Sequence, residues 1–142
     1  MYTTFKCFLI LLIFLIGCSD EKITNSSSDV FGLYESSRFV EPGSADGGID
    51  IQTAGGYLTI TLNDDYTFSS ELYIPENINS NYPKGKTEYQ GKFIVSDELV
   101  NFEEGDFIIQ EIKWDKSTRQ LLTLEVPLRG QPFEIILYKY LR

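Results

Sequence analysis

From Val30 to its carboxyl terminus, the chain alternates short runs of β-branched and aromatic residues with polar turns, and this pattern most constrains its fold. The run Tyr57–Leu62 places Leu58, Ile60 and Leu62 on one face and a tyrosine and two threonines on the other. A period of two is typical of a half-buried strand, and no run of about ten residues has the 3.6-residue period of an amphipathic helix. The sequence therefore predicts an all-β domain.

Eight strands are expected, because residues that favour turns separate eight short apolar runs. Consecutive strands with hairpin-length turns favour an antiparallel up-and-down meander, and pairing the last strand with the first protects both edges. We therefore expect an eight-stranded antiparallel barrel, with a two-sheet β-sandwich as the alternative. The expected strands are residues 32–40, 57–62, 66–74, 87–95, 99–102, 106–114, 120–126 and 133–141.

The connections between these strands alternate in length. Those at residues 41–55 and 75–86 are long, whereas those at 63–65 and 96–98 are short. Alternate connections of an up-and-down barrel lie at the same end. We therefore expect one end closed by tight turns and another that carries long loops, as in a cup.

The first 17 residues have the layout of a secretory signal: a basic residue, an apolar run and a small residue. The apolar run covers residues 7–16, which is shorter than the roughly 20 residues of a membrane-spanning helix. The segment Leu15-Ile16-Gly17-Cys18 resembles the lipobox of bacterial lipoproteins. This resemblance implies cleavage before Cys18 and acylation of its thiol and its new amino group. An uncleaved membrane anchor is the alternative.

The residues after Cys18 resemble lipoprotein sorting signals. Ser19 stands where an aspartate would mark retention in the inner membrane, and Ser19-Asp20-Glu21 resembles an acidic tag for export to the cell surface. We therefore expect a lipid anchor in the outer membrane, facing either the periplasm or the cell surface. Residues 18–29 are expected to be the acylated cysteine with a flexible tether, and residues 30–142 the barrel domain.

Composition excludes several classes of function. The chain has a net charge of −9 and no histidine, so nucleic acid is not an expected partner. Cys7 leaves with the leader and Cys18 is consumed by lipid, which removes thiol and imidazole groups for catalysis or zinc binding. The acidic clusters lack the spacing of a calcium-binding EF-hand. We expect no catalytic residue, metal or cofactor, and a carboxylate-only hydrolase is the least favoured alternative.

Four segments resemble lipocalins and small lipocalin-like lipoproteins in their order and spacing. They are the opening Phe31-Gly32-Leu33-Tyr34, the hairpin at residues 62–68, the strand at residues 89–93 and the last strand at residues 136–140. Tyr34 stands where the family has a tryptophan. The resemblance implies a calycin-type barrel in which a cation, Lys139 or Arg142, packs over that opening aromatic residue.

The inward faces of the expected strands carry large apolar side chains. We expect a wall for a small hydrophobic or aromatic ligand near the end with long loops, and the alternative is an ordinary packed core. Small residues on the same faces, Ser70 and Gly91, would leave space for a ligand. The expected wall residues are Phe68, Leu72, Tyr89, Phe93 and Trp114.

The expected strands at residues 106–114 and 133–141 are apolar on both faces, whereas a sheet with one buried face alternates. Extra apolar surface outside a barrel is typical of a protein interface or of a surface covered by a helix, and the alternative is a two-layer fold whose sheet is covered on both sides by loops or the tether. The leading hypothesis is a lipid-anchored, non-enzymatic protein that binds a hydrophobic ligand in a barrel cup. The alternative is an interaction module of an envelope complex.

Overall fold

The computed structural model describes residues 29–41, 48–103, 106–123 and 134–140. These residues form strands joined by turns and loops, and no helix among them is long and apolar enough to cross a membrane. The strands are β1 (Gly32–Glu41), β2 (Ile49–Asp50), β3 (Tyr57–Leu62), β4 (Thr67–Ile74), β5 (Gly85–Ser96), β6 (Leu99–Phe102), β7 (Glu111–Asp115), β8 (Gln120–Leu122) and β9 (Glu134–Lys139).

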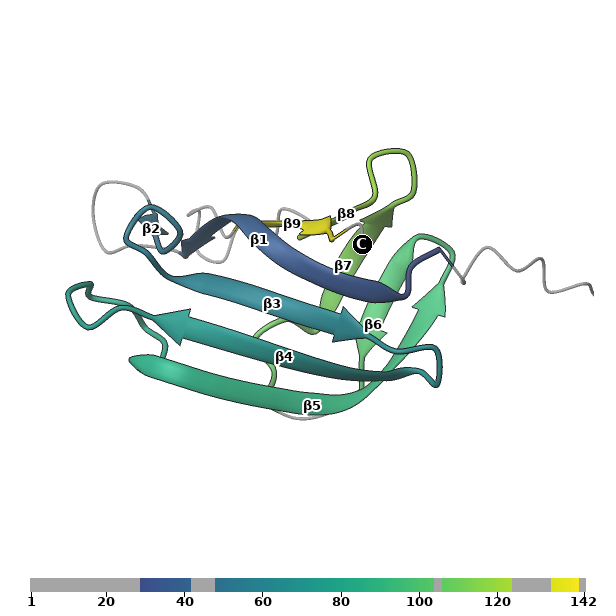
Figure 1. The fold of residues 1–142 in the computed structure, drawn as a ribbon, viewed down its shortest axis with the longest axis horizontal. Coiled ribbons are helices and arrows are strands. Elements are labelled where there is room, and N and C mark those ends of the chain that lie inside the picture. The colour runs from purple at the N-terminus through teal and green to yellow at the C-terminus, as the bar shows by residue number, and fades with distance from the viewer. Residues whose placement is uncertain (1–28, 42–47, 104–105, 124–133, 141–142) are drawn as a thin grey trace, which may run out of the picture.

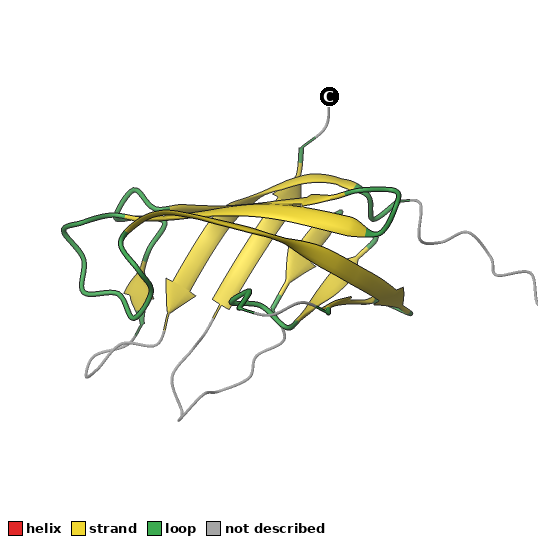
Figure 2. Ribbon diagram, turned by 90° about the horizontal axis from the view of Figure 1, so that it is seen from below, coloured by secondary structure: helices red, strands yellow, loops and turns green. Residues whose placement is uncertain are grey.

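The strands form one antiparallel sheet in the order β2-β1-β3-β4-β5-β6-β7-β8-β9, and β1 also pairs with β9 (Figure 1). That last pairing runs from Tyr34 opposite Lys139 to Val40 opposite Glu134, with a register shift between Ser36 and Arg38. Eight strands therefore close into a barrel, and β2 is a short addition beside β1. The predicted barrel is confirmed. Strands on opposite walls cross when seen from below, as strand tilt in a closed barrel requires (Figure 2).

The two ends of the barrel differ as predicted. Tight turns at residues 63–66, 97–98 and 116–119 close one end, and the longer connections between strands lie at the other. Each tight turn contains a left-handed residue other than glycine: Tyr66, Asp97 and Arg119 have φ angles of 63°, 56° and 56°. In the first turn, Asp65 Oδ1 accepts a hydrogen bond of 3.0 Å from the amide of Thr67. We call the two ends the tight end and the looped end.

Side chains with a period of two fill the interior. Leu58, Ile60 and Leu62 of β3 are buried, while the residues between them face outward. Fully burying one such side chain contributes about 1.5–3 kcal/mol. One cluster of buried apolar residues includes members of β1, β3 to β9 and the segments beside them. The described residues therefore close the sheet around one core of their own.

Residues 106–110 are not part of a strand, so the expected strand at residues 106–114 begins too early. β7 begins at Glu111, and the residues before it form a connection. Phe107 and Ile109 are buried within this connection, and Gln110 Nε2 donates a hydrogen bond of 3.0 Å to the carbonyl oxygen of Phe107. Packing of these side chains into the core produces an apolar run that a period-of-two pattern cannot distinguish from a strand.

Smaller differences occur elsewhere. β2 was not expected, and its two residues pair with Val40 and Glu41 of β1. β5 begins two residues earlier than expected and β9 ends at Lys139. The described part of the expected strand at residues 120–126 is β8, and residues 124–126 lie outside the described residues.

Candidate functional site

The predicted lipid-attachment residue, Cys18, and the leader before it lie outside the described residues. Their role stays a prediction that depends on the sequence. Asp29, three residues before β1, lies at the tight end of the barrel.

The five predicted wall residues come from β4, β5 and β7, and all five have positions on the inward faces. Four are almost fully buried: Phe68 is 2% exposed, Leu72 0%, Phe93 1% and Trp114 3%. Tyr89 is half-buried. Their inward orientation therefore agrees with the period-of-two analysis, and their use by a ligand stays a prediction.

Aromatic neighbours occupy the space around these residues. Phe68 contacts Phe102 and Phe107, with ring centroids 4.7 Å and 5.0 Å away, and Phe107 also lies 5.3 Å from Tyr89. Phe93 contacts Phe31 at 6.3 Å. The structure thus brings Phe68 and Tyr89 together through Phe107, a residue that sequence reasoning placed on a strand.

Trp114 lies apart from this cluster, at the tight end. Its ring meets that of Tyr34 edge to face, with centroids 5.8 Å apart, and the Tyr34 hydroxyl donates a hydrogen bond to the carbonyl oxygen of Val30. Lys139 Nζ lies 6.0 Å from the Trp114 ring centroid. The cation expected over the opening aromatic residue therefore packs on Trp114, which is the neighbour of Tyr34. Arg142, the other candidate, lies outside the described residues.

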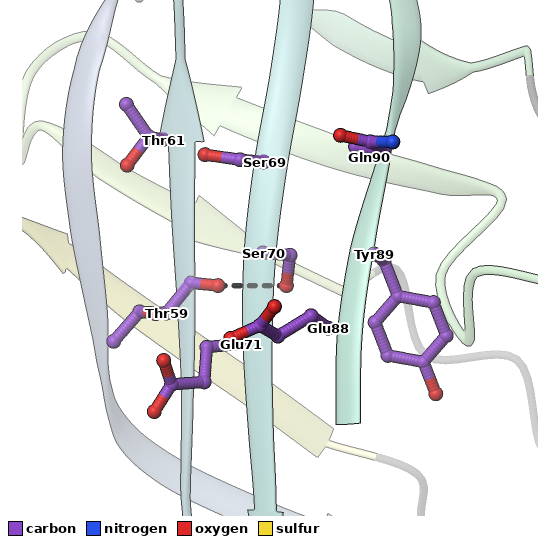
Figure 3. A pocket seen from close by; sticks show the side chains of 8 residues that line it. All are labelled: Thr59, Thr61, Ser69, Ser70, Glu71, Glu88, Tyr89 and Gln90. Atoms are coloured by element: carbon purple, nitrogen blue, oxygen red, sulfur yellow. Dashed lines mark hydrogen bonds between the residues drawn. The ribbon is translucent and has the colours of Figure 1, made fainter. Parts of the chain in front are cut away.

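An open hollow of about 540 Å³ lies on the outer face of β3, β4 and β5. Cross-strand register builds its floor from two rows, shown in Figure 3. The first row is Thr59, Glu71 and Glu88, and the second is Thr61, Ser69 and Gln90. Ser70 and Tyr89 complete the lining. The right-handed twist of strands curves the outer face of a barrel along the strand direction, which allows a concave surface here.

Charges at one edge of the hollow are paired. Tyr57 Oη donates a hydrogen bond of 2.5 Å to Glu71 Oε1, and Lys86 Nζ lies 2.7 Å from Glu71 Oε2 and 2.9 Å from Glu88 Oε1. The bond from Lys86, followed by that from Tyr57, lowers the pKa of Glu71 below its usual range. The same bonds to Glu71 raise the pKa values of Lys86 and Tyr57. The Glu71 carboxylate is therefore ionised and accepts hydrogen bonds from Tyr57 and Lys86.

Other polar groups in the hollow are uncommitted. In the part of the chain that the structure describes, the side chains of Thr61, Ser69 and Gln90 make no hydrogen bond. Tyr57 and Tyr73 stack beside the first row, with ring centroids 5.5 Å apart and an interplanar angle of 29°. Rigid strands thus present hydroxyl, amide and carboxylate groups next to an aromatic pair.

No family model matches the chain, and comparisons with curated proteins and with solved structures give no significant match. The site must therefore be interpreted from its own chemistry.

The polar side chains that line the hollow can donate and accept hydrogen bonds. A general acid needs a pKa raised toward neutrality, whereas hydrogen bonding and charge lower the pKa of Glu71. Among the described residues, no group of three or more histidines, cysteines, aspartates or glutamates is arranged to hold a metal ion.

Sequence reasoning missed this hollow, although the alternation of β3 already marks Thr59 and Thr61 as outward residues.

The apolar surface expected outside the last strand is smaller than the sequence suggests. Ile135 and Leu137 of β9 are buried, Ile136 is half-buried and Tyr138 is 49% exposed. Phe107 and Ile109 face the core. The observation behind the predicted envelope-protein partner is thus explained largely by core packing, and the partner itself stays a prediction.

Proposed function

We propose that this protein is a lipid-anchored, non-catalytic binding protein of the bacterial outer membrane, and that its barrel binds a hydroxyl-rich ligand of the saccharide class. The observation that carries the proposal is the polar hollow on the outer face of β3, β4 and β5. The resemblance of residues 15–18 to a lipobox supports the anchor at Cys18.

The chemistry of the hollow supports a saccharide. Sugar hydroxyls both donate and accept hydrogen bonds, as do the side chains of Thr61, Ser69 and Gln90. The carboxylates of Glu71 and Glu88 accept strong hydrogen bonds and would repel an anionic ligand. The stacked rings of Tyr57 and Tyr73 offer an apolar surface beside these groups. A neutral, hydroxyl-rich ligand fits this combination best.

A hydrophobic ligand in the barrel interior is less well supported. Such a ligand would displace side chains that already pack against each other, such as Phe68 and Phe107, whose ring centroids are 5.0 Å apart. Removing such packing costs several kcal/mol. Tyr89 connects the two hypotheses, because it is a predicted wall residue that also lines the outer hollow.

The test is a nuclear magnetic resonance titration of the chain from Ser19 to Arg142, which contains the whole barrel. Three neutral probes are used: cellotriose, maltotriose and triacetylchitotriose. The proposal predicts that at least one probe shifts the amide signals of β3, β4 and β5 around Ser69 and Gln90. Absence of shifts with all three probes, or shifts confined to interior residues, would overturn it.

A further inference from the structure

The tight end of the barrel concentrates positive charge in a chain whose net charge is −9. A hollow of about 280 Å³ there is lined by Asp29, Trp114, Lys116, Arg119 and Lys139. These residues come from the start of β1, the end of β7, the turn to β8 and the end of β9, which meet at this end (Figure 1). Three cations therefore face one carboxylate.

Lys139 is held by neutral groups. Its Nζ donates a hydrogen bond of 2.5 Å to the carbonyl oxygen of Asp29 and lies 6.0 Å from the Trp114 ring centroid. Burial lowers the pKa of Lys139, and the positive charge of Arg119 lowers it further, against the raising effect of Asp29. The Lys139 ammonium is thus held in place by a carbonyl oxygen and an aromatic ring, and neither contact is an ion pair.

The nearby carboxylates leave an excess of positive charge. Asp29 pairs with Lys116 at 3.2 Å, whereas Arg119 forms no ion pair within the described ranges. Asp115, the last residue of β7, is not part of the lining; it accepts hydrogen bonds at one oxygen from the amides of Ser117 and Thr118 and keeps its negative charge. The lining of the hollow therefore carries two positive charges more than negative ones.

Trp114, one of the residues that line the hollow, also carries a hydrogen-bond donor without a partner among the described residues. The indole Nε1 of Trp114 is buried and has no hydrogen-bond partner in the described structure. Buried N–H groups without partners are uncommon, and the positive end of this one adds to the local potential. Arg119, at a φ angle of 56°, is fixed in the turn, and its carbonyl oxygen accepts a hydrogen bond of 3.1 Å from the amide of Lys139.

We propose that this hollow binds a phosphate group, through Lys116, Arg119 and Lys139. A phosphate monoester carries about −1.5 to −2 charges at neutral pH, which balances the excess of the lining. The guanidinium of Arg119 suits phosphate oxygens because its planar N–H groups can bind two of them at once. The outer hollow does not suit a phosphate, because its two glutamates would repel an anion.

The phosphate has two possible sources, a lipid headgroup or a free phosphate compound. Asp29 follows Cys18 by eleven residues, and a chain of that length spans at most about 40 Å when extended. An acylated Cys18 would thus keep the tight end within reach of the bilayer surface. The headgroup source rests on the proposed lipid anchor, whereas phosphate recognition itself does not.

Trp114 is the only tryptophan of the chain, so its fluorescence reports on this hollow. The chain from Ser19 to Arg142 is titrated with inorganic phosphate, and is floated with phosphatidylcholine vesicles that contain or lack phosphatidic acid, whose phosphate is a monoester. The site variant is Lys116→Gln with Arg119→Gln. The matched control, Lys84→Gln with Lys92→Gln, removes two exposed charges outside the hollow.

The proposal predicts a saturable change in fluorescence or flotation that the site variant weakens at least about tenfold and the control leaves unchanged. A response to phosphate without flotation assigns a free phosphate compound, and flotation that requires phosphatidic acid assigns the headgroup. No response in either assay overturns the proposal. Equal losses in the site variant and the control also overturn it, because they indicate general attraction between charges.

Discussion

Phe107 lies against Phe68, with their ring centroids 5.0 Å apart, although Phe107 belongs to a connection and Phe68 to β4. Phe102 completes this group, 4.8 Å from Phe107. The connection therefore supplies part of the barrel core. Phe68, one of the residues expected to form a ligand-binding wall, is therefore packed against another side chain of the core.

Phe107→Ala should destabilise the protein strongly. Loss of the buried ring removes contacts with Phe68 and Phe102 and leaves a cavity, which typically costs about 3–5 kcal/mol. Urea unfolding followed by circular dichroism measures the change in the free energy of unfolding. Ile94→Ala is the control, because Ile94 is 48% exposed and should change stability by about 0.5 kcal/mol or less. Equal effects of the two substitutions would contradict the packed interior.

Glu41 ties the loop after β4 to the end of β1. Its carboxylate is fully buried and accepts hydrogen bonds of 2.8 Å from Ser80 Oγ and 3.0 Å from the amide of Asn81. Glu41→Ala leaves these donors without their acceptor, so we expect a loss of about 1–3 kcal/mol.

Hydrogen exchange measures the local effect of this substitution. Amides of residues 76–84 should exchange faster in Glu41→Ala, whereas those of the tight turns should change no more than the global stability requires. Glu76→Ala, an exposed glutamate in the same loop, is the matched control. Unchanged exchange at Asn81 in the Glu41 variant would show that the carboxylate does not hold the loop.

Acid should remove the contribution of Glu71 to stability. Its pKa is lowered in the folded protein from an ordinary value of 4.5 by Lys86 and then by Tyr57. Because the pKa of Glu71 is lower in the folded state, its stabilisation is complete above the pKa of the unfolded state. It is lost as the pH falls through the pKa of the folded state. Wild type should therefore be more stable than Glu71→Gln at about pH 6, and this difference should shrink as the pH falls from 4.5 toward about pH 2. A difference that is constant between these pH values would contradict the assignment.

Local patterns predicted most of the strands. Residues 57–62 and 99–102 match β3 and β6, because apolar alternation and the turn residues beside each strand are signals within a few residues. The buried state of Phe68, Leu72, Phe93 and Trp114 follows from the same alternation. Closure of the barrel was predictable because eight consecutive strands leave two edges that must be protected.

Features that depend on long-range contacts were not predictable. Phe107 and Ile109 lie in an apolar run, and their place in the core is decided by neighbours on other strands. β2 has two residues, too few for a pattern. The outer hollow requires the register that sets Thr61, Ser69 and Gln90 side by side, and the basic hollow requires Asp29, before β1, to lie near Lys139 at the end of β9.

Cys18 should carry the lipid. Cells grown with radiolabelled palmitate should label the wild-type protein and leave Cys18→Ala unlabelled, because the thiol and the amino group of the cleaved cysteine are the expected acylation sites. Cys7→Ala removes the other cysteine of the chain and is the control. It should be labelled as well as wild type, since residue 7 belongs to the cleaved leader. Equal labelling of Cys18→Ala would contradict the anchor.

The affinity of the outer hollow for a neutral trisaccharide tests the account most directly. Ser69→Trp places a large ring on the floor of the hollow, and Ile94→Trp places the same ring on the outer face of β5 outside it. Isothermal titration calorimetry is carried out with the trisaccharide that shifts the amide signals most. We predict that Ser69→Trp weakens binding at least about tenfold, a loss of about 1.4 kcal/mol, while Ile94→Trp binds as wild type does. Unchanged binding by Ser69→Trp would contradict the account.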